Sequence, residues 1–333
     1  MHYRGQTKAA HERVSSKTGV LITNLGTPSA PTKQALKPYL REFLSDPRVV
    51  ELPKWKWWPI LYGIILNIRP AKSAKLYASV WTEKGSPLMT ISLAQRDALQ
   101  KQLGDEYVVR LGMRYGQPSI ASEVQSFQDQ GINKLIVLPL YPQYSAPTTG
   151  STFDALSKEI AGWRWMPNLH FINTYHDHTL YIDALCQSIE RHREAHGEPE
   201  RWVFSYHGMP QRYLESGDPY FCLCQKTTRL VAEKLNLHKE AYITSFQSLF
   251  GREEWLKPYT DATLEQLGHD GVKHIAVLCP GFSADCLETI EEIGEENREV
   301  FAKAGGQTYH YVPALNAEPA HIAMMEALVK SRT

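Results

Sequence analysis

Two side chains that could share one chemical task, His207 and Glu288, each lie near the end of an apolar stretch of the chain. His207 follows the strand-like residues 203–206, and Gly208 then opens a tight turn. In an open parallel α/β sheet, ligands bind at the carboxyl ends of the strands, so the two side chains are expected at one sheet edge. A neutral imidazole with a carboxylate suits a divalent metal such as Fe²⁺, or the removal of a proton.

The segment after residue 280 adds a file of carboxylates behind Glu288. Built as an α-helix from Asp285, it places four glutamates within about 60° of one another, namely Glu288, Glu292, Glu295 and Glu299. Such a face is more often simply solvated, and a lone histidine in a turn is more often structural. The alternative is that the file conducts a cation or protons to and from the pair.

Strand-like and helical segments alternate ahead of these residues. Apolar runs at 19–25, 108–113 and 134–140 predict buried strands. Between them, periodicity predicts helices over 33–44, 72–79, 88–103 and 118–129. This rhythm is typical of parallel βαβ units.

The same order of segments occurs twice. Residues 25–28 (LGTP) have their counterpart in 207–210 (HGMP), and residues 131–138 match 271–278 at an offset of 140. We therefore expect an α/β protein of two similar Rossmann-like domains, each with a parallel sheet flanked by helices, facing across a cleft. The expected boundaries are 18–178 and 179–314, with a C-terminal helix in 315–333 that packs on the first half and a flexible segment 1–17.

Composition limits the classes of function. The chain has 333 residues, with 36 basic and 36 acidic side chains, so no basic field favours nucleic acid. The polar N-terminal residues do not resemble a secretory signal, and the five cysteines are scattered, so we expect a cytoplasmic protein. No GxGxxG or GxxxxGK[ST] pattern predicts a dinucleotide or nucleotide phosphate site.

The most apolar segment lies between Trp55 and Ile68 and is too short to cross a bilayer. It is compatible with a core helix. It is equally compatible with an exposed lip, including Trp58, that grips a flat apolar ligand or contacts a membrane peripherally. Basic residues follow at Arg69, Lys72 and Lys75 and could hold anionic groups. A tetrapyrrole would suit all of these features: it is a flat apolar ring with propionate groups, and it binds a metal with the loss of two protons.

The sequence resembles the ferrochelatases over about residues 18–329. The most specific motif is FSYHGMP-(x)₆-GDPY at residues 204–220, with further blocks LGTP, GSPL, LYPQYS-(x)₃-TG, FQSLFGREEWLKPYT and PGFSADCLET. The resemblance implies a lyase that inserts Fe²⁺ into protoporphyrin IX, releasing two protons, in the last step of haem synthesis. Fe²⁺ and protoporphyrin IX are then substrates, and no tightly bound cofactor is expected.

The resemblance also implies residue roles. His207 and Glu288 would be the catalytic, metal-contacting pair, with Asp285, Glu292 and Glu296 as the acidic file. Residues lining the porphyrin cleft would be Leu25, Arg114, Tyr115 and Tyr141, to which the lip adds Trp58.

Cysteine positions depart from part of the family. Some relatives carry a [2Fe-2S] cluster with a cysteine after YPQYS, where this chain has Ala146, and three near the C-terminus, where none follows Cys286. That cluster is therefore not expected, although four other thiols leave a different one open. Alternative functions are a chelatase for coproporphyrin or another tetrapyrrole, and a non-catalytic haem or tetrapyrrole carrier. The sequence predicts no oligomeric state.

Overall fold

The computed structural model describes residues 3–5, 14–251 and 253–333, which form two compact units. The first unit comprises Met1–Leu140, Ala146–Asn173 and Met325–Thr333, and the second comprises Tyr141–Ser145 and Thr174–Met324. Most of the segment 1–17 that we expected to be flexible lies outside the described residues. Within it, the Arg4 backbone N–H donates to the Gly162 carbonyl at 2.8 Å.

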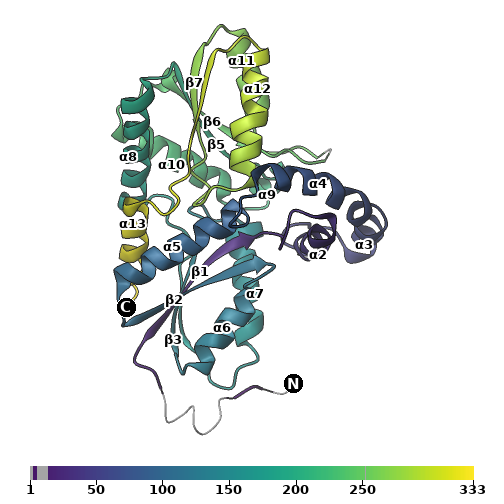
Figure 1. Ribbon diagram of the computed structural model, residues 1–333, viewed down its shortest axis with the longest axis vertical. Helices are drawn as coiled ribbons and strands as arrows, with labels where there is room; N and C mark the ends of the chain where they lie inside the picture. The colour runs from purple at the N-terminus through teal and green to yellow at the C-terminus, as the bar shows by residue number, and fades with distance from the viewer. Residues whose placement is uncertain (1–2, 6–13, 252) are drawn as a thin grey trace. The chain divides into compact units, whose positions relative to one another are not determined.

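The first unit is built on a parallel sheet of order β2-β1-β3-β4 (Figure 1). The strands are β1 (Thr18–Gly26), β2 (Tyr107–Tyr115), β3 (Lys134–Pro139) and β4 (Asn168–Phe171). Nearly every residue of β1 is buried, which is typical of a parallel strand covered on both faces. In Figure 1, α5 (Pro87–Leu103) lies on one side of this sheet, and α6 (Ile120–Asp129) with α7 (Ser151–Ile160) lies on the other.

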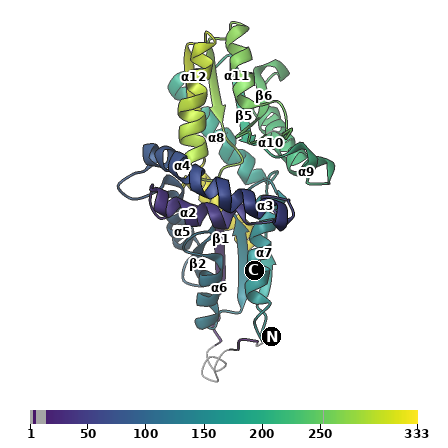
Figure 2. The ribbon, with the colours of Figure 1, turned by 90° about the vertical axis from the view of Figure 1, so that its right-hand side faces the viewer.

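A helical layer follows β1 and contains the apolar segment. It consists of α2 (Lys33–Leu44), α3 (Lys54–Ile60), the π-helix η1 (Leu61–Ile65) and α4 (Leu66–Val80), seen together in Figure 2. One side of the segment is buried through Trp57, Leu61 and Leu66. The other side exposes a row of large apolar side chains, Trp55, Trp58, Ile60, Tyr62, Ile64 and Ile68. One side of the segment therefore belongs to the core, and the other side forms the exposed apolar surface that the sequence analysis called a lip.

The second unit repeats the first. Its parallel sheet has the order β6-β5-β7-β8, in which β5 to β8 take the places of β1 to β4 in the first sheet. The strands are β5 (Arg201–His207), β6 (Tyr242–Gln247), β7 (His274–Leu278) and β8 (Thr308–Val312). The predicted fold class, two similar α/β halves with parallel sheets flanked by helices, is confirmed.

Helices flank the second sheet in the same way. The helices of this half are α8 (Thr179–His196), α9 (Gln211–Glu215), α10 (Tyr220–Lys234), η3 (Lys239–Ala241), α11 (Thr260–His269) and α12 (Asn297–Lys303), whereas α13 (Pro319–Lys330) is divided between the two units. α8 packs with α10, whereas α11 packs with α12. The expected α-helix from Asp285 is wrong over most of its length, because Glu288–Glu296 forms a π-helix, η4, that passes into α12.

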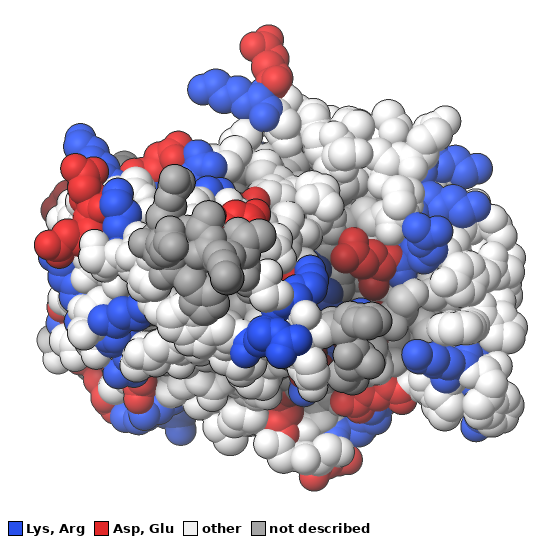
Figure 3. All heavy atoms as spheres, turned by 90° about the horizontal axis from the view of Figure 1, so that it is seen from below, with Lys and Arg blue, Asp and Glu red and all other residues white. Residues whose placement is uncertain are grey.

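No described helix combines the length and the apolarity needed to cross a bilayer. On the face drawn in Figure 3, acidic and basic side chains are interspersed among large uncharged areas. This agrees with the equal numbers of acidic and basic residues in the sequence.

Candidate functional site

His207 ends β5, the strand that pairs with both β6 and β7 in the second sheet. The chain passes from β5 to β6 on one side and from β7 to β8 on the other. The carboxyl edge between β5 and β7 is therefore the topological switch point of this sheet. The Nδ1 atom of His207 lies 2.7 Å from the Gly208 carbonyl oxygen. An oxygen acceptor requires Nδ1 to carry the proton, so Nε2 of the neutral ring keeps its lone pair.

Position 208, next to this histidine, must be glycine because the Gln247 carbonyl and the Trp255 ring lie too close to leave room for a side chain. The Gly208 backbone N–H donates to the Gln247 carbonyl at 2.7 Å. A Cβ at position 208 would lie 2.7 Å from that same oxygen and 3.0 Å from the Trp255 ring. Any larger residue would therefore push β5 away from β6 or displace Trp255.

Two aromatic rings flank the imidazole. The Trp255 and Phe282 rings each have their centroids 6.4 Å from that of His207. Both residues lie within motifs named above, FQSLFGREEWLKPYT and PGFSADCLET, but the sequence alone did not indicate them as site residues. Together the rings give the half-buried His207 an apolar surround.

Glu288 is the first residue of η4 and is half-buried. Its backbone carbonyl accepts a hydrogen bond from the Gln247 side-chain amide at 3.0 Å. Gln247 is also the β6 partner of His207 in the sheet register. One buried glutamine thus connects the strand end that carries the histidine to the turn that carries the glutamate.

Gln247 itself is held on both sides. Its Oε1 atom accepts the Ser205 hydroxyl at 2.8 Å, and its Nε2 atom lies 3.5 Å from the Glu292 carboxylate. Gln247 and its neighbour Ser248 are functional candidates that sequence reasoning missed. Their only signal was the block FQSLFG, because their roles arise from contacts between segments far apart in the chain.

Glu292 is clamped by Ser248, whose backbone N–H and hydroxyl donate to its two oxygens at 2.7 and 2.5 Å. Burial raises the pKa of Glu292 above its usual value, and the neighbouring Glu288 carboxylate adds to the rise. The Ser248 bonds and the nearby His207 oppose this shift without cancelling it. Glu292 therefore takes up a proton more readily than an exposed glutamate.

The remaining members of the expected acidic file differ from Glu292 in their burial and partners. Glu296, at the end of η4, is exposed to solvent. Asp285 is 8% exposed, and its carboxylate accepts hydrogen bonds from the Tyr311 hydroxyl and the Asn316 amide. Glu288, Glu292 and Glu296 thus pass from half-buried to exposed along the π-helix, whereas Asp285 is enclosed by protein donors.

Cys286, between Asp285 and Glu288, is buried and free of disulfide bonds. Burial raises the pKa of its thiol well above the usual value, and the Glu288 charge adds to this effect. A neutral thiol is a weaker metal ligand than a thiolate. Among the described residues, no three His, Cys, Asp or Glu side chains converge so as to hold a metal ion.

In the first unit, Arg114 and Tyr115 end β2 and share one buried partner, Asp46. The Asp46 carboxylate pairs with the Arg114 guanidinium and accepts the Tyr115 hydroxyl at 2.8 Å and the Ser151 hydroxyl at 2.6 Å. Burial opposes ionisation of Asp46, but these donors, foremost Ser151, hold its pKa below the usual value. Both residues are thus fixed at the carboxyl end of β2.

The other expected cleft residues occupy different surroundings. Leu25, at the end of β1, packs against the cluster formed by α2 to α4. Tyr141 follows β3, is half-buried and belongs to the second unit. Trp58 is 45% exposed and meets Tyr62 edge to face at 6.2 Å.

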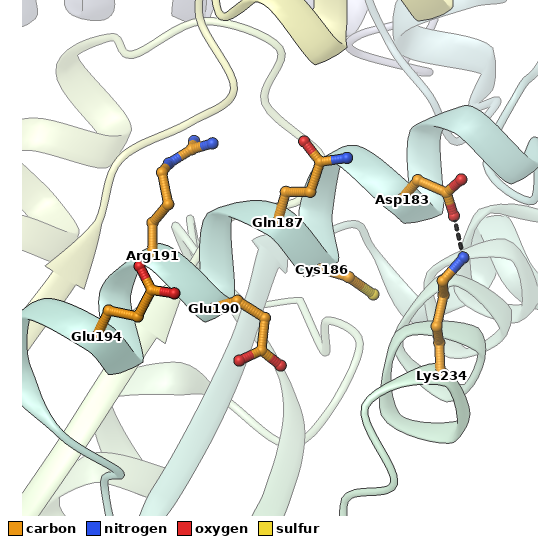
Figure 4. A pocket seen from close by; sticks show the side chains of 7 residues that line it. All are labelled: Asp183, Cys186, Gln187, Glu190, Arg191, Glu194 and Lys234. Atoms are coloured by element: carbon orange, nitrogen blue, oxygen red, sulfur yellow. Dashed lines mark hydrogen bonds and ion pairs between the residues drawn. The ribbon is translucent and has the colours of Figure 1, made fainter.

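Each unit contains a concave surface elsewhere. A cavity of about 670 Å³ in the first unit lies beside the ends of β1 and β2, lined among others by Tyr39, Arg41, Trp81 and Lys84. A cavity of about 490 Å³ in the second unit lies along α8, where Asp183 pairs with Lys234 (Figure 4). The second cavity contains no residue of the group around His207.

Comparison with known proteins identifies relatives across the whole length of the chain. The family model described as ferrochelatase matches residues 17–333. A ferrochelatase of Pseudoalteromonas atlantica is 58% identical over 99% of this chain and 92% of its own length. Ferrochelatase 2 of Shewanella oneidensis is 59% identical over 94% of this chain and 97% of its own length.

Solved structures show the same fold at low identity. SirB from Bacillus subtilis, described with Fe³⁺, aligns with a TM-score of 0.59 at 10% identity, covering 95% of each chain. The sirohydrochlorin chelatase SirB from Bacillus subtilis subspecies spizizenii, described in complex with cobalt, has a TM-score of 0.57 at 10% identity and also covers 95% of each chain. At this identity the likeness concerns the fold alone.

Proposed function

This chain belongs to the ferrochelatase family, and from that premise we propose that it inserts Fe²⁺ into protoporphyrin IX and releases two protons, the last step of haem synthesis. It would accordingly be a lyase with Fe²⁺ and the porphyrin as its substrates. The observation that carries this proposal is the Gln247 bridge, which joins the His207 strand end to the Glu288 turn at the switch point of the second sheet.

His207 acts at the porphyrin nitrogens. Because Nδ1 is engaged by the Gly208 carbonyl, Nε2 is the atom that can accept a pyrrole proton or contact Fe²⁺. Glu288 supplies a carboxylate, and the two side chains provide only two ligands between them. Loose coordination suits a metal that is handed to the macrocycle and leaves with it.

Glu292 and Glu296 receive the released protons in this proposal. The raised pKa of Glu292 suits a group that is protonated and deprotonated in each turnover. Glu296 is exposed and can exchange the proton with water. Asp285 is left out of this route, because both of its oxygens already accept hydrogen bonds within the protein.

The family resemblance further assigns porphyrin contacts to Leu25, Arg114, Tyr115, Tyr141 and Trp58. Asp46 and Ser151 already bind the Arg114 guanidinium. In this role Arg114 lines the porphyrin site with a fixed side chain and does not bind a propionate. The exposed row from Trp55 to Ile68 supplies apolar surface for the ring or for a membrane.

An anaerobic turnover assay tests the activity and the site together. Protoporphyrin IX and Fe²⁺ are mixed with the enzyme, and the loss of free-porphyrin fluorescence is followed. We expect His207→Ala and Glu288→Ala to lower kcat by about 100-fold or more, as removal of a proton-transfer group does. The matched variants His269→Ala and Glu265→Ala, on the exposed face of α11, should retain wild-type turnover.

Two results would contradict the proposal in different ways. Stoichiometric porphyrin binding without turnover by the wild-type protein would indicate a carrier, or a chelatase for another ring, and coproporphyrin would then be assayed. Wild-type turnover that survives in both variants would leave the activity in place and remove the assigned site.

Membrane contact by the lip is tested by sedimentation with phospholipid vesicles. We expect Trp55→Ser combined with Ile68→Ser to reduce the bound fraction, because both side chains are more than two-thirds exposed. Trp165→Ser, which removes an exposed tryptophan in the loop before β4, is the matched control. Equal binding by all three proteins would rule out the lip as the contact.

A further inference from the structure

Asp285 is enclosed by donors from three segments of the second unit. Its Oδ1 atom accepts the Tyr311 hydroxyl at 2.6 Å and the Thr289 hydroxyl at 2.9 Å, and its Oδ2 atom accepts the Asn316 amide at 2.7 Å. The Ala314 backbone N–H adds a longer contact to Oδ1 at 3.3 Å. A carboxylate this fully engaged is an anchor between segments.

Asn316 is the reciprocal half of this anchor. Its Oδ1 atom accepts the Asp285 backbone N–H at 2.9 Å, so the two residues are joined by a closed pair of hydrogen bonds. Asn316 has a φ of 45°, which asparagine tolerates better than most residues. Its carbonyl accepts a hydrogen bond at 2.7 Å from Nδ1 of His321, a side chain with no exposed surface.

The anchor lies at the start of the turn that carries Glu288. Thr289, which donates to Asp285, also accepts the Cys286 backbone N–H at 3.0 Å. β8 adds a second tie further along, where the Tyr309 hydroxyl donates to the Ile293 carbonyl of η4 at 2.6 Å. The backbone on both sides of Glu288 is thus held from the segment that includes β8 and continues to Asn316.

We propose that Asn316 is a positioning residue for the chelatase reaction, which fixes the Glu288 turn through its paired hydrogen bonds to Asp285. This inference rests on the proposed function, and it assigns Asp285 to the same anchor rather than to the path of iron or protons. The anchor requires one carboxylate facing one amide, so that each side chain finds a hydrogen-bond partner in the other. Either position can carry the carboxylate.

A charge-swap series tests this assignment. Asn316→Asp places two carboxylates face to face and removes the amide donor, while Asp285→Asn places two amides there. The double variant Asp285→Asn/Asn316→Asp restores one amide and one carboxylate with their positions exchanged. The control is Asn236→Asp, because Asn236 also has a positive φ, of 53°, but is exposed beyond the end of α10.

We expect Asn316→Asp to lower kcat/KM for Fe²⁺ and protoporphyrin IX by about tenfold at pH 8, from the loss of a part-buried hydrogen bond to Asp285. The loss should shrink as the pH falls towards 6, because two facing carboxyl groups that share a proton regain a donor. The double variant should recover most of the wild-type kcat/KM. Asn236→Asp should match the wild type throughout.

The contrary outcomes are distinct. A double variant as inactive as Asp285→Asn alone would mean that a carboxylate is needed at position 285, as a relay requires. If Asn316→Asp had the kinetics and the pH profile of the wild type, Asn316 would not be a positioning residue. Amide hydrogen exchange over residues 286–290, measured on the same proteins, does not depend on turnover. If the wild type proves inactive, faster exchange in Asn316→Asp that is reversed in the double variant would support the anchor, and unchanged exchange would overturn it.

Discussion

At the scale of single residues, Gln247 organises the candidate site although it has no reactive group of its own. It is buried, and its amide bridges the Ser205 hydroxyl to the Glu288 carbonyl. An amide suits this place because it offers a donor on one side and an acceptor on the other. A carboxylate there would be repelled by Glu292.

Replacing Gln247 by Met keeps the volume and removes both hydrogen-bonding functions. We expect a loss of about 1–3 kcal/mol in the free energy of unfolding, because buried partners are left unpaired. A fall in kcat of about tenfold or more should accompany it, since the Glu288 turn loses its tether. Urea unfolding and the anaerobic turnover assay measure the two effects.

Gln128→Met is the matched control for this substitution. Gln128 is similarly buried, on α6 of the first unit, and accepts a hydrogen bond from Gln125 at 2.7 Å. It should lose stability and keep kcat. If both variants lose activity in proportion to stability, Gln247 has a structural role only.

At the scale of elements, the sequence predicted β1, β2 and β3 and their repeat in the second half, because buried parallel strands are continuous apolar runs bounded by turns. It did not predict β4 or β8, which are short and only partly buried. It failed at η4, where α-helical spacing was assumed. A π-helix contains the same residue types, and its wider turn depends on tertiary contacts such as Tyr309 to the Ile293 carbonyl. Sequence reasoning proposed His207 and Glu288 from their places after strands, but it missed Gln247, whose role exists only in the folded chain.

Gly294 lies inside η4, where its flexibility lowers the stability of the helix. A Cβ there would meet only the Thr289 carbonyl oxygen, at 3.5 Å, which is an ordinary contact. We expect Gly294→Ala to raise the free energy of unfolding by about 0.5–1 kcal/mol, because alanine loses less backbone entropy on folding. Urea unfolding of the purified protein measures the change.

Gly306→Ala is the opposing control, since its Cβ would lie 2.2 Å from the Phe301 ring. That variant should be destabilised by overpacking. A destabilised Gly294→Ala variant would show that the π-helical turn needs glycine for its backbone geometry.

At the scale of the whole molecule, four histidines gather on one side of the second sheet. His192 and His196 lie on α8, His274 begins β7, and His310 lies on β8, with ring centroids 4.3 to 5.4 Å apart in neighbouring pairs. Burial lowers the pKa of His192 to about 4, and the neighbouring imidazoles add to this effect. Burial likewise lowers the pKa of His310, so folding keeps both rings neutral.

These shifts predict a loss of stability in mild acid. The unfolded chain takes up protons near pH 6.5, whereas folded His192 does so only near pH 4. Its contribution to stability is therefore complete above about pH 6.5 and is lost as the pH falls towards 4. For His192 alone the loss is about 3 kcal/mol across this window. It should appear as a falling urea midpoint.

Replacing His192 by Phe removes the titrating group and keeps a ring against Trp202, which His192 meets edge to face at 5.7 Å. We expect this variant to show a flatter fall in the urea midpoint between pH 6.5 and 4 than the wild-type protein. His269→Phe, on the exposed face of α11, should keep the wild-type slope. If His192→Phe also kept that slope, the acid sensitivity of the molecule would have to arise from other buried groups, of which His321, with a pKa lowered by burial to about 4, would be the next to replace.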